Sequence, residues 1–306
     1  MKSIGTSFDY KPQTIKRIIH DTNGQIYEHR IMNAIWREET KSIDLYVVIR
    51  GVGGTSIARM FDRRYLATRE TPWDSMVEKE FRSALVDGDL SGQEVELRAH
   101  RECLKQYERQ KNIYEFVKQE HLYYFQEYET SITFIMSNTP GGHYQEYFNV
   151  KGILLQHVTE AKPLPRSLTL TSASHVRRTA VKVFNNLARS GILLEDYDLN
   201  DIFVFLEFDL EFVFMDVDQL RFRSEYKDDD DWANNVIAWR RHFNKAIAAT
   251  VDDQLTEADL FLEPPFIFTD NLEGAFGGFT RETFIRFSRK NWEKCKELWG
   301  HIVSFY

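Results

Sequence analysis

The chain has 306 residues and a formal net charge of −8, with 42% hydrophobic and 14% aromatic residues. This length is enough for one large domain or for two lobes with cores of their own. The composition is that of a soluble globular protein. The acidic balance argues against non-specific nucleic-acid binding, which needs a basic face.

The cysteine count and the absence of apolar segments in the sequence predict an intracellular location. Cys103 and Cys295 are the only cysteines, and so few thiols in so long a chain suggest a reducing compartment. The N-terminal stretch MKSIGTSFDYKPQ has no apolar region typical of a secretory signal. No apolar run reaches the roughly 18 residues that a membrane span needs. We therefore expect an intracellular protein, cytoplasmic or nuclear, without membrane or nucleic-acid partners.

The first 158 residues are predicted to form a strand-rich part with long helices. Asn23-Gly24, between two β-forming runs, is a strong hairpin signal. Apolar spacing predicts strands over Thr14–Ile19, Gln25–Ile35, Leu45–Ile49, Ser56–Phe61, Ser131–Met136 and Gly152–Val158, and helices over Asp74–Val86 and Ser91–Gln119.

Residues 159–306 are predicted to be mainly helical. Ser174–Ser190 has an amphipathic pattern, and a predicted hairpin follows, with strands over Ile202–Phe208 and Phe212–Met215. Further helices are predicted over Trp232–Ile247 and Thr280–Val303. The four aspartates Asp228–Asp231 are read as a solvated loop or a helix N-terminus. The whole pattern predicts an α+β fold of two parts, 1–158 and 159–306.

Three aspartates lie at loop positions around the predicted hairpin. Asp196 and Asp201 flank a short loop, and Asp216 follows the second strand. A hairpin that returns on itself brings the third acid close to the first two. Clustered carboxylates at strand ends form a site for a hard cation such as Mg²⁺. The alternative for Asp196 is an ordinary turn residue.

The order of these landmarks resembles the protein-kinase-like superfamily, and more narrowly its divergent fungal kinase-like members. The segment Leu194-Glu195-Asp196-Tyr197 is similar to the start of the family's H-R-D-L-x-x-x-N loop, with Asp201 at the asparagine position. Asp216-Val217-Asp218 resembles the D-F-G motif, in the D-x-D form of the small-molecule-kinase branches.

The N-terminal part carries the rest of the resemblance. In ARMFDRRYLA, Arg59 stands where the family has its strand lysine. Glu96 looks like the helix glutamate that pairs with this lysine, and Glu94 is a second candidate. The alternatives are a surface-facing strand residue for Arg59 and an exposed helix charge for Glu96. Gly152–Val158 looks like the strand that enters the adenine-binding hinge, whose residues would be Gln156, His157 and Val158.

The resemblance implies a bilobal kinase-like fold that binds ATP and Mg²⁺ and acts on a protein or small-molecule hydroxyl. Asp216 would hold magnesium, Asp201 would hold a second metal or share the first, and Asp196 would accept the hydroxyl proton. Arg59, held by Glu96, would offset the charge of the nucleotide phosphates.

Several departures from the family pattern leave a second interpretation open. Arg59 replaces a lysine with a planar fork, Asp201 adds a negative charge, and Leu194 replaces the histidine of the loop. The glycines of RGVGGTS are too close to Arg59 for a phosphate loop and are interpreted as a turn, and no A-P-E element is found. The two hypotheses are an ATP-dependent phosphotransferase and an inactive pseudokinase that serves as a binding or scaffolding module.

Overall fold

The computed structural model describes residues 2–3, 10–21, 23–37, 42–49, 54–65, 75–136, 145–158, 161–168, 170–195, 199–205, 211–215 and 217–250. The chain divides into two compact units. Unit 1 comprises residues 1–119 and 126–159, and unit 2 comprises residues 120–125 and 160–306. The sequence placed the boundary after residue 158. The predicted helix 280–303 lies outside the described residues.

Unit 1 is built on an antiparallel sheet that closes on itself. Its strands are β1 (Lys2–Ser3), β2 (Ile15–His20), β3 (Gln25–Arg37), β4 (Ser42–Ile49), β5 (Ser56–Phe61), β6 (Tyr128–Ile135) and β7 (Asn149–Gln156). The strand order is β1-β3-β2-β6-β7-β5-β4, and an additional β3–β4 pairing completes the ring. The predicted hairpin is confirmed, because β2 and β3 pair antiparallel across a turn in which Gly24 has a φ of 66°.

The inward side chains of this closed sheet form an apolar core. Because side chains alternate across a strand, β4 sends Ile43, Leu45 and Val47 inward and Asp44 outward. On β5 the same alternation sends Ala58 and Met60 into the core and leaves Arg59 on the outer face. The register of two strands thus puts an acid and a base side by side on the outside of the sheet.

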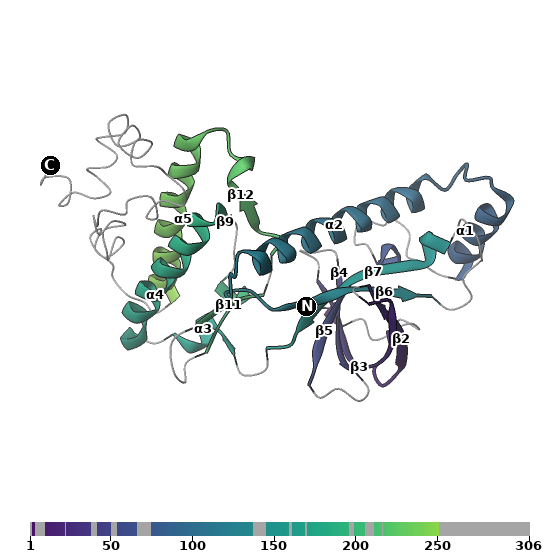
Figure 1. Cartoon of the computed structure of the whole chain (residues 1–306), viewed down its shortest axis with the longest axis horizontal. Coiled ribbons are helices and arrows are strands. Elements are labelled where there is room, and N and C mark those ends of the chain that lie inside the picture. Colours follow the sequence, from purple (N-terminus) through teal and green to yellow (C-terminus); the bar gives the residue numbers. More distant parts are fainter. Residues whose placement is uncertain are drawn as a thin grey trace, which may run out of the picture. The chain divides into compact units, whose positions relative to one another are not determined.

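Two helices belong to unit 1, α1 (Ser75–Asp87) and α2 (Glu94–Gln119). Figure 1 shows α2 lying along the strands, and α2 contacts β5, β6, β7 and the short helix η1 (Arg63–Tyr65). Phe81 and Leu85 bury one side of α1. Met76 and Val86, which fit the predicted apolar spacing of this helix, are 67% and 70% exposed.

Unit 2 is mainly helical with short strands. Its elements are β8 (Lys162–Pro163), α3 (Leu164–Ser167), α4 (Leu170–Arg189), β9 (Ile192–Leu194), η3 (Leu199–Asp201), β10 (Ile202–Phe205), β11 (Glu211–Phe214), β12 (Leu220–Phe222), η4 (Arg223–Glu225) and α5 (Asp229–Thr250). The predicted hairpin is confirmed as the antiparallel pair β10–β11. Helices α4 and α5 pack through aromatic rings, with Phe184 3.9 Å from Trp239 and 4.7 Å from Phe243 between ring centroids.

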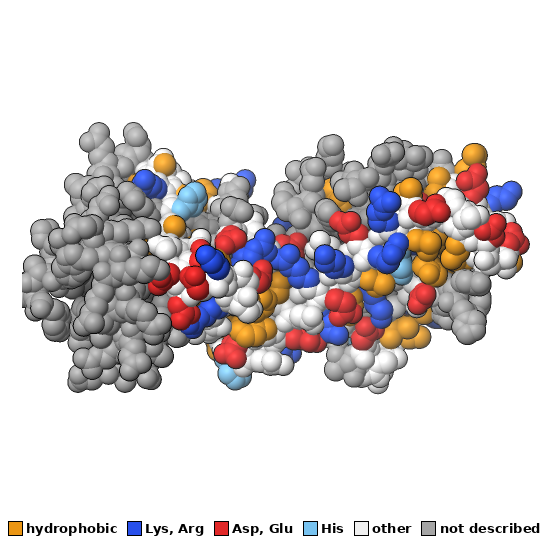
Figure 2. Space-filling model, turned by 90° about the horizontal axis from the view of Figure 1, so that it is seen from above, with side chains coloured by type: hydrophobic (Ala, Val, Ile, Leu, Met, Phe, Trp, Pro, Cys, Tyr) orange, Lys and Arg blue, Asp and Glu red, His pale blue; other side chains and the backbone are white. Residues whose placement is uncertain are grey.

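The mixed strand and helix content confirms the α+β class. None of the helices in the described ranges is both long and apolar enough to cross a membrane. On the face shown in Figure 2, acidic and basic side chains are interspersed over the described surface.

Gly152 lets β7 lie close against the strand that carries Arg59. A Cβ atom at this position would come within 2.6 Å of the Arg59 carbonyl oxygen and 2.7 Å of the Met60 sulfur. The Met60 side chain can move aside, but the backbone oxygen of a paired strand cannot do so without disturbing the ladder. The local spacing of β5 and β7 therefore depends on a glycine here.

We expect Gly152→Ala to lower the free energy of unfolding by about 1–3 kcal/mol, the usual cost of overpacking a core. Urea denaturation followed by circular dichroism measures the change. Lys105→Ala on the exposed face of α2 serves as control and should change stability by less than about 0.5 kcal/mol. Equal stability of Gly152→Ala and wild type would show that β5 and β7 have room for a side chain at this position.

Candidate functional site

Arg59 is held by an acid on the neighbouring strand. Asp44 is its register partner across β4 and β5. The Arg59 Nε lies 2.8 Å from Asp44 Oδ1, and Nη2 lies 3.1 Å from Oδ2, which is a bidentate ion pair. The Arg59 side chain is 0% exposed and that of Asp44 is 1% exposed. The alternative of a surface-facing strand residue therefore does not hold.

A second arginine shares the same carboxylate. The Arg37 Nε donates to Asp44 Oδ2 at 2.5 Å, and the Arg37 side chain is 10% exposed. Burial by itself raises the pKa of Asp44, but the guanidinium groups of Arg59 and Arg37 outweigh it and hold the pKa below its ordinary value. Asp44 is thus ionised at neutral pH, and the cluster of three side chains carries one excess positive charge.

Helix α2 presents Gln110 to Arg59. The Gln110 Oε1 accepts a hydrogen bond from Arg59 Nη1 at 3.3 Å, and Gln110 is fully buried. Glu96 lies 14 residues earlier in α2, which corresponds to about 21 Å along the helix axis. The structure therefore does not bring Glu96 to Arg59 as the resemblance implied. The residue of α2 that contacts Arg59 is Gln110, whose side chain is a neutral amide.

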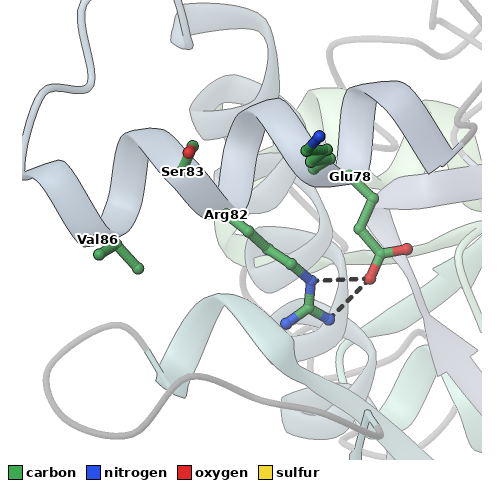
Figure 3. Close-up of a pocket in the computed structure, with 5 residues that line it drawn as sticks. Glu78, Arg82, Ser83 and Val86 are labelled. Atoms are coloured by element: carbon green, nitrogen blue, oxygen red, sulfur yellow. Dashed lines mark hydrogen bonds and ion pairs between the residues drawn. The ribbon is translucent and has the colours of Figure 1, made fainter.

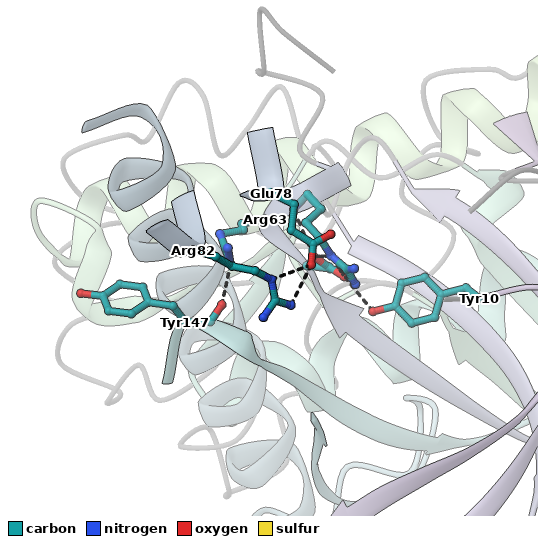
Figure 4. Close-up of polar contacts among 7 residues, drawn as sticks. Tyr10, Arg63, Glu78, Arg82 and Tyr147 are labelled. Atoms are coloured by element: carbon teal, nitrogen blue, oxygen red, sulfur yellow. Dashed lines mark hydrogen bonds and ion pairs between the residues drawn. The ribbon is translucent and has the colours of Figure 1, made fainter. Parts of the chain in front are cut away.

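Glu96 instead faces the short helix η1. Its Oε2 lies 3.6 Å from the Nε of Arg63, and both side chains are buried. The Arg63 Nη1 also donates to the carbonyl oxygen of Tyr147 at 2.5 Å (Figure 4). The guanidinium lies over the rings of Phe81 and Phe148, at 4.6 and 5.7 Å from their centroids. Glu96 is thus a buried structural acid and not an exposed helix charge.

The same region contains two further ion pairs. Tyr10 donates to Asp62 Oδ2 at 2.8 Å, and Asp62 also pairs with Arg64. On α1, Arg82 pairs with Glu78 at 2.7 Å, as Figures 3 and 4 show. Glu78 and Arg82 line an open pocket of about 520 Å³ together with Lys79, Ser83 and Val86. None of the predicted site residues lines this pocket.

The predicted hinge lies at the end of β7, and part of its backbone is already hydrogen-bonded. The Gln156 N–H donates to the Glu127 carbonyl at 2.9 Å, and the Gln156 carbonyl accepts from the Gln126 side chain at 2.9 Å. The His157 N–H donates to the Thr55 carbonyl at 3.3 Å. An adenine ring would form its hydrogen bonds with backbone N–H and carbonyl groups of this kind. Val158 is half-buried and lies just past the end of β7, outside any helix or strand.

The three predicted acids of unit 2 are only partly described. Asp196 and Asp216 lie outside the described residues, and Asp201 is described as the last residue of η3 but not in its side chain. Their proposed roles in metal binding and proton transfer stay predictions. Within the described ranges, no group of three or more His, Cys, Asp or Glu side chains could hold a metal ion.

The chain that leads up to Asp196 is paired with the chain that follows Asp216. Strands β9 and β12 pair antiparallel, and the Glu195 N–H donates to the Gln219 carbonyl at 2.8 Å. The Glu195 carboxylate accepts from the Tyr226 O–H at 2.5 Å and lies 3.3 Å from the Nε of Arg221. Burial, followed by the hydrogen bond to Glu195, raises the pKa of Tyr226. The residue that precedes Asp196 is therefore fixed by the chain that follows Asp216.

The aspartate run begins a helix, one of the two alternatives from the sequence. Asp228 precedes α5 and its Oδ1 accepts from the Asp231 N–H at 2.9 Å, while Asp229 receives the Arg223 guanidinium at 2.6 Å. Acids at a helix N-terminus are stabilised by unpaired N–H groups and by the helix dipole. This run is accounted for by helix capping.

Sequence reasoning missed Asp44, Arg37 and Gln110. No local motif marks them, since each becomes important only through the β3–β4–β5 register or the placement of α2. The one usable signal was Asp44 itself, a charge inside the apolar run SIDLYVVI.

Comparison with known proteins gives only distant similarities. No protein-family model matches the chain, and no curated protein matches it. Among solved structures, similar chains include the ROP18 kinase domain in complex with AMP-PNP and sucrose (10% identity, TM-score 0.39, 70% of this chain and 58% of that one). Another is ROP2 from Toxoplasma gondii, described as having a protein-kinase fold and no enzymatic activity (12%, 0.36, 69% and 56%). A third is the Rio2 kinase from Chaetomium thermophilum (12%, 0.37, 83% and 69%). The chain thus spans less than three fifths of the first two.

We expect Arg59→Met to lower the free energy of unfolding by about 3–5 kcal/mol, because it leaves the buried Asp44 carboxylate with one partner fewer. The triple variant Arg59→Met/Asp44→Leu/Arg37→Met should recover most of this loss, since it removes all three charges of the buried cluster. Arg17→Met is the matched surface control, because Arg17 is 78% exposed and lies 3.9 Å from Glu28. A loss under 1 kcal/mol in the single variant would contradict a structural role for the pair.

The buried histidine of α2 makes unit 1 acid-sensitive. Burial, followed by the charge of Arg63, lowers the pKa of His100 from 6.5 to about 4. The unfolded chain binds this proton below pH 6.5 and the folded chain only near pH 4, so stability is lost as the pH falls between these values. We expect His100→Phe to remove part of this loss, up to roughly 3 kcal/mol. Denaturant curves from pH 7 to pH 4 measure it, and identical pH profiles would count against this assignment.

Proposed function

We propose that the chain is a kinase-like protein that acts as a binding or scaffolding module and does not transfer phosphate effectively. The proposal begins from the order of landmarks in this chain. A strand that carries a basic residue, a long helix, two further strands and a helix followed by acid-bearing loops occur in that order along β5, α2, β6, β7 and α4. This order favours a kinase-like design.

The observation that carries the inactive assignment is the burial of Arg59. Phosphate binding requires a cation that can reach the nucleotide. Arg59 has no exposed surface, and both edges of its guanidinium are used by Asp44 and Gln110. To contact a phosphate it would have to leave the Asp44 carboxylate in the interior, a loss of the order of 3–5 kcal/mol. We therefore assign Arg59 a role in stability and not in phosphate binding.

Two further observations support the same proposal. A neutral Gln110 accepts a hydrogen bond from Arg59, whereas Glu96, the acid that the resemblance assigns to this pair, contacts Arg63 about 21 Å away along α2. The Gln156 N–H and carbonyl and the His157 N–H already have partners inside unit 1. Nucleotide binding at this hinge would have to break or bypass these hydrogen bonds.

One feature favours the alternative of an ATP- and Mg²⁺-dependent phosphotransferase. Asp196, Asp201 and Asp216 are all present in the sequence, and these acids would supply the metal ligands and the proton acceptor. A protein or small-molecule hydroxyl would then be the acceptor. The experiment below separates the two functions.

We expect no phosphate transfer from radiolabelled ATP with Mg²⁺, either to the chain itself or to a mixture of protein and small-molecule hydroxyl acceptors. Asp216→Asn is the matched variant, since it removes the predicted metal ligand. Transfer by the wild type that disappears in Asp216→Asn would overturn the inactive assignment. Transfer that persists in the variant would point to a contaminating kinase, and repeated purification to constant specific activity would then decide between the two.

Nucleotide binding is tested separately by thermal unfolding. A ligand present at a hundred times its Kd stabilises the folded state by about 2.7 kcal/mol, which raises the Tm by several degrees. We expect no such rise with millimolar ATP and Mg²⁺, because the hinge groups and Arg59 are engaged. A saturable rise that Asp216→Asn abolishes would show that the nucleotide site is intact.

A further inference from the structure

The outer face of the hairpin formed by β2 and β3 is apolar at positions where a solvated sheet face is normally polar. Ile18 of β2 and Ile31 of β3 lie in the core, so alternation turns the odd-numbered residues of β2 outward, and the even-numbered residues of β3 before its bulge. Ile15 and Ile26 on this outer face are 52% and 62% exposed. Ile19, the register partner of Ile26, is half-buried.

The neighbouring strand β6 extends the apolar face. Ile135 follows Phe134, the register partner of Ile18, and is therefore turned outward beside β2. Met32 lies at the bulge of β3, at the edge of the same face. We refer to the outward side chains of residues 15–19 and 26–32, together with Ile135, as the β2–β3 face. Within the described residues, four of the eight exposed large apolar side chains belong to it: Ile15, Ile26, Met32 and Ile135.

Helix α2 covers a different part of the sheet. It packs on β5, β6 and β7, and Figure 1 shows β2 and β3 on the side of unit 1 away from this helix. Single exposed apolar side chains are normal on a protein surface, but a contiguous group of them marks an interaction surface. The β2–β3 face is therefore a candidate for contact with another molecule.

The charged residues of the β2–β3 face follow the same register. The Arg17 Nε lies 3.9 Å from Glu28 Oε1, and their side chains are 78% and 33% exposed. An exposed ion pair of this length contributes little to folding, so both groups are available for a second contact. The three cross-strand rows of the face are Ile19 with Ile26, Arg17 with Glu28, and Ile15 with Arg30.

We propose that the β2–β3 face is an isologous dimer interface that packs on the same face of a second copy of this chain. The two-fold axis would run parallel to β2 and β3, between the two strands, so that β2 of one copy lies over β3 of the other. Because Arg17 and Glu28 share one row, Arg17 then lies over the partner's Glu28, and Glu28 lies over the partner's Arg17. The charges of the two copies are thus complementary at both symmetry-related positions.

The same axis matches the apolar rows. It places Ile19 over the partner's Ile26, and Ile15 over the partner's Arg30, whose aliphatic stem covers an apolar side chain. Two sheets that pack face to face with aligned strands lie about 10 Å apart and bury side chains in this way. All three rows therefore have a suitable counterpart in a second copy.

Self-complementarity favours a second copy over other occupants. A different protein would have to present an acid to Arg17 and a base to Glu28 at the spacing of two paired strands, which a second copy does through its own register. The predicted helix 280–303 of the same chain is basic, with six Lys or Arg against three Asp or Glu. It would set like charges against Arg17 and Arg30.

The size of the β2–β3 face predicts a weak, reversible dimer. A standard interface uses about 20–30 residues from each partner, and this face offers fewer. We therefore expect a dimer Kd of roughly 10–100 µM. The interface is independent of the proposed function, because none of the nucleotide landmarks lies on this face.

The test is analytical ultracentrifugation of the full chain over roughly 1–500 µM, a range that brackets the expected Kd. Ile26→Lys sets a charge against the partner's Ile19 and should raise Kd at least about tenfold. Val95→Lys is the matched control, because Val95 is 61% exposed and lies in α2, outside the face. It should change Kd by less than about twofold.

A charge exchange tests the two-fold arrangement itself. Arg17→Glu places an acid over the partner's Glu28 and should raise Kd about fivefold or more. The double variant Arg17→Glu/Glu28→Arg exchanges acid and base within the row and should restore Kd to within about threefold of wild type. Association driven by the isoleucines alone would show no such recovery.

Circular dichroism shows whether each variant is folded. If Ile26→Lys unfolds, Arg17→Glu and its charge exchange still decide the question, since Arg17 is largely exposed. A chain that stays monomeric over the whole range would overturn the dimer and leave the face to a partner of another kind. A Kd that Ile26→Lys leaves unchanged, or that Val95→Lys raises equally, would place the contact elsewhere. Absence of recovery in the double variant would overturn the proposed axis.

Discussion

The ion pair between Arg59 and Asp44 sets the constraint from which most properties of unit 1 follow. A charge without exposed surface must be paired, because leaving it alone in the interior is costly. The pair requires β4 and β5 to keep one register, since a one-residue slip of either strand would turn its own charge into the apolar core and away from its partner. It also draws Gln110, and with it the middle of α2, onto the outer face of the sheet. Stability and geometry therefore depend on a residue that the resemblance assigned to catalysis.

A basic side chain can stabilise the fold or bind a ligand, and its surroundings determine which of the two it does. Arg59 has its carboxylate on the adjacent strand, where no movement is needed to keep it. A planar guanidinium suits this arrangement, since its fork matches a carboxylate at two points. A lysine at this position would make a single contact and remain easier to redirect. The arginine is thus suited to a structural role between β4 and β5.

The sequence predicted elements well and partners poorly. The span of β5 agrees at both ends with its prediction. Helix α4 buries the apolar positions of its amphipathic pattern, because local periodicity determines which face is apolar; these positions are Val176, Ala180, Val183, Phe184 and Leu187. The ion-pair partner of Glu96 could not be predicted in this way. Its partner depends on how far α2 extends past the end of β5, and a helix of 26 residues offers several acids at plausible spacing. The ring closure of the sheet through β2 and β6 was also invisible, since these strands are more than a hundred residues apart.

The short stretch 120–125 gives the chain an unusual connectivity. It follows α2 of unit 1, yet it belongs to unit 2, where Phe125 bridges to Phe214 and the Tyr124 carbonyl accepts from the Phe214 N–H. The polypeptide therefore enters unit 2, returns to complete β6 and β7, and enters unit 2 again after residue 159. No single cut can separate the two units. A fragment ending at residue 159 would retain Leu122 and Phe125 without the surfaces that bury them, and expressing the first unit alone would need a redesigned connection between α2 and β6.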